Sequence, residues 1–357
     1  MGEIKKFFIR GVCFLLIFAA LFMGLQYVLH YRWANEDKLY TRYMDYASVE
    51  EGSADVVYFG TSELYTGINP LAMYNAEGIT GYNLTVTDRS AITQYYQVLY
   101  ALKTNRPKVV ACDFMSLIDQ DGKKTLDELY RKNIAAMPDA RLKREMINAV
   151  AKEDENQTWL ALTFPLLRYH NMWNTIEEKN FRPDLEISPS YEPFTKGCWF
   201  VTEEFVGDPY DIVPALWDPR DDAEVNLAPD ETAVKYYDLL IQACRERDVP
   251  VVAIFPPIIG GAWLYQMQWD VKEAYFDSRG IDYLNYDTYE EVKRMDLNWD
   301  DYWDNIHLNV RGSVKFSEVV ARDLKEKYGL TDHRAANDLT EDWDAEWEEF
   351  ESRYLTQ

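Results

Sequence analysis

The chain has 357 residues, of which 47% are hydrophobic and 15% aromatic, so it is too rich in large apolar side chains to be disordered. Its formal net charge of −24 argues against a nucleic-acid-binding protein, because contact with phosphates needs clustered Lys and Arg. The four cysteines are widely scattered, which fits neither a disulfide framework nor a cysteine-rich metal site.

An uncharged stretch of 19 residues, 11–29, lies near the N-terminus. As a helix it would extend about 28 Å, close to the thickness of the hydrocarbon core of a bilayer. Lys5, Lys6 and Arg10 precede it, so the positive-inside rule predicts a cytoplasmic N-terminus and an extracytoplasmic remainder. We therefore expect residues 1–32 to form a cytoplasmic stub and an uncleaved signal anchor, with a cleaved signal peptide as the alternative.

The part of the chain after this anchor is strongly acidic. Residues 1–32 carry a net charge of +3, so the remainder carries −27 and will be repelled by anionic lipid. Three cysteines follow the anchor: Cys112, Cys198 and Cys244. Because their number is odd and Cys112 lies in an apolar run, we expect buried thiols and not disulfide bridges.

Short apolar runs alternate with helical patterns after the anchor. The runs that resemble strands are 56–59, 79–84, 108–114, 250–255 and 281–286. The patterns that resemble helices are 89–103, 231–246 and 312–328. This alternation predicts a mainly parallel sheet with helices on both faces, and five strands suit a flavodoxin-like three-layer α/β/α sandwich. In such sheets, ligands bind at the carboxyl ends of the strands.

Two segments depart from the alternating pattern. Residues 119–229 carry clustered aromatics and prolines, and we expect them to form an inserted cap over the carboxyl edge of an extracytoplasmic domain at 33–330. The tail at 331–357 has nine Asp and Glu against two Arg, interleaved with Trp343, Trp347 and Phe350. We expect a solvated helix that these aromatic side chains hold on the surface.

Two short motifs could carry chemistry. Gly60, Thr61 and Ser62 directly follow the first predicted strand, and Asp304 lies three residues before His307, ahead of the last helix. An Asp at that spacing can accept a hydrogen bond from Nδ1–H of the His, which leaves Nε2 to take the proton of a serine. Either motif alone could be a turn, a helix cap or a surface ion pair. Together, in this order and on this fold, they predict a catalytic triad.

The two motifs resemble those of the SGNH (GDSL-type) hydrolases, a superfamily of flavodoxin-like esterases and acyltransferases. There the serine follows the first strand in a Gly-Asp-Ser motif; in this chain Thr61 replaces the Asp. The anchor, the sequence Gly-Thr-Ser-Glu-Leu and the segment 82–84 most resemble the membrane-anchored branch that contains the D-alanyl transfer protein of lipoteichoic acid synthesis. The segments 168–173 and 196–198 resemble anchored members of the superfamily from Gram-positive bacteria.

The resemblance also implies where an oxyanion hole and an acceptor site would lie. The candidates for oxyanion or substrate binding are Asn83, Asp88, Ser116 and His170. Counting from Asn83, Asp88 occupies the position of a glycine whose N–H is a donor in the superfamily. The asparagine expected after the third predicted strand is absent, and Ser116 lies in that region. His170 and its aromatic neighbours would shape an acceptor site or, alternatively, pack the cap. No cofactor and no metal site are predicted.

The sequence and the resemblance together predict a membrane-anchored extracytoplasmic acyltransferase. It would move an acyl group, through an ester of Ser62, onto a hydroxyl of a cell-envelope polymer or glycan. A membrane-bound O-acyltransferase partner is what the resemblance implies. Two alternatives remain: an esterase or deacetylase of cell-surface glycans, in which water takes the acyl group, and a non-catalytic envelope assembly protein that keeps the fold.

Overall fold

A computed structural model describes residues 2–29, 38–87, 90–118, 127–170, 174, 176–181, 192–221, 223, 225, 227–336, 339 and 342–356 of the chain. Its strands are β1 (Val56–Phe59), β2 (Gly81–Asn83), β3 (Val109–Cys112), β4 (Val251–Phe255) and β5 (Asp282–Asn285). All pair in parallel, in the order β2-β1-β3-β4-β5. Each predicted strand is therefore present: β1 has its predicted bounds, and the other four are each shorter than predicted by one to three residues. The predicted α/β fold class is confirmed.

Helices cover both faces of this sheet. One side carries α2 (Leu39–Ser48), α5 (Ala91–Thr104), α10 (Glu231–Arg245) and α12 (Trp269–Arg279), and the other α3 (Ser62–Gly67), α4 (Pro70–Glu77), α13 (Tyr289–Arg294) and α14 (Val310–Tyr328). The short helix α11 (Ala262–Met267) precedes α12, and its Ala262 belongs to the apolar cluster on the side of α3 and α14. The strand side chains alternate between two apolar clusters. Val57 and Phe59 pack toward α5 and α10, whereas Val56 and Tyr58 pack toward α3 and α14. Because both faces are covered, β1, β3 and β4 are completely buried, as their unbroken apolar sequences predict.

Local signals fix where the main helices begin. Ser90 accepts a hydrogen bond from the backbone N–H of Thr93 and starts α5, and Asp230 caps α10 through the N–H of Ala233. The side chain of Asn309 accepts from the N–H groups of Arg311 and Gly312, so α14 begins two residues earlier than its apolar pattern suggests.

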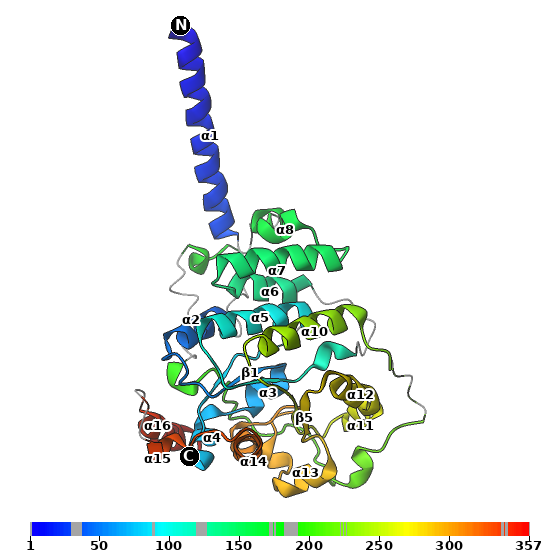
Figure 1. Ribbon diagram of the computed structural model, residues 1–357. Coiled ribbons are helices and arrows are strands. Elements are labelled where there is room, and N and C mark those ends of the chain that lie inside the picture. Colours follow the sequence, from blue (N-terminus) through cyan, green and yellow to red (C-terminus); the bar gives the residue numbers. More distant parts are fainter. Residues whose placement is uncertain are drawn as a thin grey trace.

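The segment 119–229 is inserted between β3 and α10, and its two ends meet. Ile118 and Pro229 form an isolated antiparallel bridge. Within the segment, α6 (Asp127–Ala136) and α7 (Ala140–Glu153) form a further layer over α5, next to α8 (Trp159–Thr163) and α9 (Pro165–Tyr169) (Figure 1). Residues 196–201 lie beside the end of β2 and beside α3: the N–H of Asn83 donates to the carbonyl of Lys196, and the N–H of Trp199 donates to the carbonyl of Tyr65. The first part of the inserted segment therefore adds a layer of helices to one face of the sandwich. Its last part lies at the edge of the sheet that a cap would cover.

The helix α1 (Gly2–Val28) projects from the folded domain (Figure 1). It is the one helix of the described chain that is long and apolar enough to cross a membrane, and none of its apolar window is buried by the rest of the protein. Cys13 is exposed on it, whereas Cys112, Cys198 and Cys244 are free, buried thiols, as expected from their number and setting.

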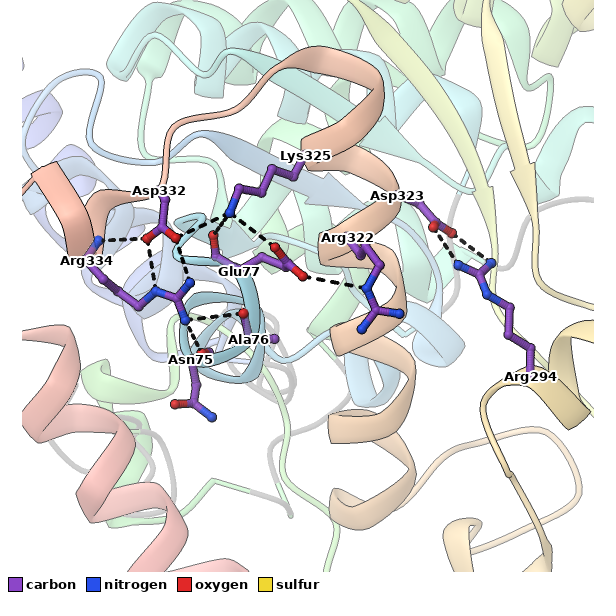
Figure 2. A network of polar contacts seen from close by, with 9 residues as sticks. All are labelled: Asn75, Ala76, Glu77, Arg294, Arg322, Asp323, Lys325, Asp332 and Arg334. Atoms are coloured by element: carbon purple, nitrogen blue, oxygen red, sulfur yellow. Dashed lines mark hydrogen bonds and ion pairs between the residues drawn. The ribbon is translucent and has the colours of Figure 1, made fainter.

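The C-terminal residues pack onto the domain at two points. Trp343 and Phe350 of α16 (Trp343–Tyr354) are buried against α4, so the expected surface helix is present. In the segment between α14 and α16, the guanidinium of Arg334 donates two hydrogen bonds to Asp332 (Figure 2). Near the end of α14, Nζ of Lys325 donates to the backbone carbonyl of Glu77 (2.7 Å), at the end of α4. The hydrogen bonds from Arg334 hold the pKa of Asp332 well below its usual range.

Candidate active site

Ser62 is placed at the carboxyl edge of the sheet by a tight turn. The strand β1 ends at Phe59, and Ser62 is the first residue of α3, so its backbone N–H has no acceptor within that helix. Gly60 allows the turn to close: a Cβ at this position would overlap the side chain of Leu64 and lie 2.8 Å from a carboxylate oxygen of Asp113. A side chain at position 60 would therefore push the turn away from the sheet.

Ser62, His307 and Asp304 form one chain of hydrogen bonds. Oγ of Ser62 lies 2.7 Å from Nε2 of His307, and Nδ1 of the same ring lies 2.7 Å from Oδ2 of Asp304. These are the distances that a nucleophile, a general base and an orienting carboxylate need. The imidazole is nearly enclosed, with 13% of its side chain exposed, while Asp304 is 36% exposed. The structure therefore brings the three residues of the predicted triad together.

The loop that carries His307 is held from several directions. Oδ1 of Asp304 accepts hydrogen bonds from the backbone N–H groups of Ile306 (2.9 Å) and His307 (2.8 Å). The indole of Trp303 stacks on the imidazole, with ring centres 5.3 Å apart. Behind the loop, Nδ2 of Asn309 donates to the backbone carbonyls of Asp300 and Tyr302. The loop is thus fixed to the first turn of α14.

The pKa of the Asp304 carboxyl is lowered. Partial burial opposes its ionisation, but the hydrogen bonds from the ring of His307 and from the N–H groups of Ile306 and His307 favour the charged form and outweigh burial. Asp304 is therefore a carboxylate at neutral pH, and its Oδ2 acts as an acceptor. That favours the tautomer with a proton on Nδ1 of His307, which leaves Nε2 as the acceptor facing Ser62.

Asp113 holds the turn that carries Ser62, and sequence reasoning missed it. Its Oδ2 accepts hydrogen bonds from the backbone N–H of Thr61 and from the Thr61 hydroxyl (2.8 Å), and its Oδ1 accepts from the N–H of Met115. It is the first residue after β3, at the same edge as Ser62. A polar residue directly after a buried parallel strand was the signal available for it.

A pocket with about 350 Å³ of empty space opens beside the turn, at the ends of β1, β4 and β5. Its lining includes apolar side chains together with buried ionisable ones, Glu63, Lys272 and Asp287. Burial raises the pKa of Glu63, whose carboxylate lies 3.4 Å from Oγ of Ser62. Burial lowers the pKa of Lys272 to about 8, against the opposing effect of Asp287 and Asp113. Glu63 lies within the sequence Gly-Thr-Ser-Glu-Leu, but no pattern indicated Lys272 or Asp287.

Asp287 should make the stability of the protein depend on pH. Burial raises its pKa to about 7 from 3.8, although Trp217 Nε1 and the N–H of Ile258 donate to it. Between these two values the folded chain retains a proton that the unfolded chain has released, so wild-type stability falls as pH rises. We expect this loss to reach at most about 1.4 kcal/mol per pH unit and to be absent in Asp287→Asn.

Urea unfolding of the full chain at about pH 5 and about pH 8 tests this expectation, because the two values bracket most of the Asp287 titration. Asparagine keeps a carbonyl oxygen that can accept from Trp217 and Ile258. Asp208→Asn, on an exposed surface, controls for the loss of one charge. A free-energy difference between wild type and Asp287→Asn that stays the same at both pH values would contradict the prediction.

The remaining predicted site residues lie in other settings. The Asn83 side-chain amide donates to the carbonyls of Leu64 and Ile68, so it uses both hydrogens to hold α3 against β2. Ser116 lies just past β3, where its N–H donates to the hydroxyl of Tyr237. His170 is exposed at the end of α9, a helix that contacts α1, and it is not part of the hydrogen-bonded chain at Ser62. Asp88 lies outside the described residues.

No group of three or more His, Cys, Asp or Glu within the described ranges is arranged to hold a metal ion.

The second part of the inserted segment contacts the site through aromatic and backbone groups. The N–H of Trp199 donates to the carbonyl of Tyr65 in α3, and its ring lies 6.1 Å from that of Trp303. These contacts border the Ser62–His307 pair with large side chains.

Comparison with known proteins adds little to this geometry. No family model and no curated protein matches the chain. Among solved structures, one from Bacteroides fragilis NCTC 9343, provisionally described as an acylhydrolase, is similar at a TM-score of 0.38 and 9% identity; the match covers 83% of this chain and 98% of that one. A likeness this low carries no argument. What the chain does must therefore be inferred from its own strands and side chains.

Proposed function

We propose that this chain is a membrane-anchored serine enzyme that transfers an acyl group through an ester of Ser62. The observation that carries the proposal is the hydrogen-bonded chain from Ser62 through His307 to Asp304. Serine is a weak nucleophile unless a neighbouring base takes its proton. A Ser–His–Asp chain with a structural role would not need to reach solvent, whereas all three residues are partly exposed at the edge of the sheet.

In the first half of the reaction, Nε2 of His307 takes the proton of Ser62 as Oγ attacks the carbonyl carbon of an acyl donor. The imidazolium that forms is stabilised by the carboxylate of Asp304. His307 then gives the proton to the leaving oxygen, and an acyl ester of Ser62 remains. In the second half, an acceptor hydroxyl or water loses its proton to Nε2, attacks the ester and releases Ser62.

A tetrahedral intermediate in this reaction carries a negative oxygen that needs hydrogen-bond donors. The backbone N–H of Ser62, at the first turn of α3, is one donor in this proposal. The side-chain amide of Asn83 is occupied by backbone carbonyls and is not assigned this role. We assign the second donor to the backbone N–H of Asp88, on the basis of its position in the sequence relative to the superfamily's glycine.

The acceptor in this proposal is a hydroxyl of a cell-envelope polymer or glycan. An apolar helix long enough to span a bilayer precedes the domain, and tethering would hold Ser62 near polymers made at the membrane. A membrane-bound acyl donor, such as an O-acyltransferase partner, would complete the system. Hydrolysis of the same ester by water is the esterase alternative, and it uses the same three residues.

A fluorophosphonate probe tests whether Ser62 is activated. We expect the full chain in detergent to gain one adduct by intact mass, and peptide mapping to place it on Ser62. Ser62→Ala should gain none, and His307→Ala should react slower by on the order of a thousandfold, since the base is lost. Ser116→Ala, a serine at the end of the next strand, should react like wild type.

The possible results separate the alternatives. An unlabelled, folded wild-type chain would contradict the enzymatic proposal and favour the non-catalytic assembly protein. If labelling occurs as expected, an acyl ester donor presented with and without glycan or polyol acceptors distinguishes the two reactions. Acyl product on the acceptor shows a transferase, whereas free acid formed at the same rate with and without acceptor shows an esterase.

A further inference from the structure

An apolar segment is exposed on the face of the domain from which α1 emerges. Residues 159–167, which comprise α8, the turn after it and most of α9, contain no charged side chain. Trp159, Leu160 and Leu167 expose 44%, 55% and 49% of their surface. Large apolar side chains that gather on a surface mark an interaction site, and this set lies on two adjacent short helices.

These two helices are attached to the last part of α1. The ring of Phe164 packs edge-on against Phe22, with centres 5.5 Å apart, and also contacts the ring of Trp159. The N–H of Leu166 donates to the side chain of Gln26 (2.6 Å). On the other side, Arg131 of α6 donates to the carbonyl of Ala161. The pair α8–α9 is thus bound both to α1 and to the folded domain.

The position of Phe22 along α1 sets the depth of these contacts. Phe22 precedes the end of α1 at Val28 by six residues, which corresponds to about 9 Å along a helix axis. Half of the hydrocarbon core of a bilayer is about 15 Å thick. If the uncharged stretch 11–29 spans the bilayer, Phe164 lies at the level of the acyl chains in the leaflet next to the domain, and Trp159 lies beside it.

We propose that α8 and α9 insert into this leaflet, so that the domain has a second membrane contact beside the spanning helix. The occupant of the exposed apolar face is lipid, because the face continues the lipid-exposed surface of α1 at the same level. Its composition is that of an interfacial segment: Trp159, Leu160 and Leu167 are exposed apolar side chains, and the exposed Arg168 follows them. Two contacts would fix how the domain is oriented on the membrane, independently of any activity of Ser62.

The test uses the full chain in nanodiscs of phosphatidylcholine and phosphatidylglycerol. In a Cys13→Ser background, which leaves three buried thiols, Leu160→Cys and Leu167→Cys are each labelled with a small environment-sensitive fluorophore. Glu348→Cys, exposed on α16 and distant from α1 in Figure 1, is the control position. Quenching is measured with a nitroxide on the lipid acyl chain near the glycerol and, separately, with iodide in the water.

We expect the lipid nitroxide to quench the labels at 160 and 167 several-fold more strongly than the label at 348, and iodide to show the reverse order. Labels at 160 and 167 that iodide quenches as fully as the control would overturn the proposal. Labels protected from both quenchers would overturn it too, since protein would then cover the face. Labelling native Cys13 shows whether α1 itself is inserted; if that label meets no lipid, the two-contact arrangement is wrong as a whole.

Discussion

Replacing Asp304 with asparagine is expected to slow acylation of Ser62 by on the order of 10⁴-fold while leaving the fold intact. Asparagine keeps an oxygen that can accept from the N–H groups of Ile306 and His307, so the loop retains its backbone contacts. Its NH₂ group, however, replaces the oxygen that faces Nδ1 of His307. The ring must then accept at Nδ1 and carry its proton on Nε2, which removes the base that Ser62 needs.

The measurement is the rate of fluorophosphonate labelling, with hydrolysis of a simple activated ester as a second readout. Asp300→Asn is the matched control, because Asp300 is exposed on the same loop and contributes its backbone carbonyl to Asn309. In a His307→Ala background, Asp304→Asn should cause little further loss, because Asp304 acts through the imidazole. If Asp304→Asn and Asp300→Asn reacted at similar rates, Asp304 would have no part in activating Ser62.

The sheet was predictable because its strands carry a strong local signal. The runs 108–114 and 250–255 are mainly apolar without alternation, and helical patterns separate them, which is typical of parallel strands buried on both faces. The short strand β2 and the half-buried β5 were also found, since the turns and helices around them follow the same order. Parallel pairing and strand order then follow from a few rules of chain connection.

The pairing of Ser62 with His307 was predictable from chemistry more than from topology. The two residues are 245 positions apart, and the loop that carries His307 follows β5, three strands away from β1. What joins them is α14, which packs on α3 and α4 beside β1 and so brings its N-terminal loop across the sheet to Ser62. No local pattern contains that packing. The residue types and their order along the chain pointed to it.

The residues that the sequence did not reveal owe their positions to tertiary burial. Lys272 is on a helix, where a lysine is normally exposed, and only packing of α12 on β4 places it over the rings of Phe255 and Tyr265. Asn83 illustrates the opposite error. The resemblance made it a candidate for the oxyanion or substrate site, but both hydrogens of its amide are used by the carbonyls of Leu64 and Ile68. Hydrogen-bond occupancy of this kind is visible only in three dimensions.

The close approach of α14 to the catalytic loop makes Gly312→Ala a strongly destabilising substitution. A Cβ on Gly312 would overlap the backbone carbonyl oxygen of Asp301 and lie 2.8 Å from the side chain of Leu308. That carbonyl also accepts the N–H of Asn309, so it cannot turn away without loss. We expect unfolding to become easier by about 2 kcal/mol, after the gain in helix propensity of about 1 kcal/mol is included.

The same substitution should also reduce reactivity, because the displaced segment carries the base. A shift of about 1 Å between nucleophile and base can lower a rate by about a hundredfold. Gly67→Ala is the matched control: the atoms nearest to its Cβ would belong to side chains, the ring of Phe316 at 3.3 Å and Leu308 at 3.7 Å, and a side chain can yield where a carbonyl cannot. Urea unfolding and fluorophosphonate labelling of both variants give the two effects separately. Equal midpoints and equal rates for Gly312→Ala and Gly67→Ala would show that α14 can retreat without moving His307, and the positioning role assigned to its first turn would be wrong.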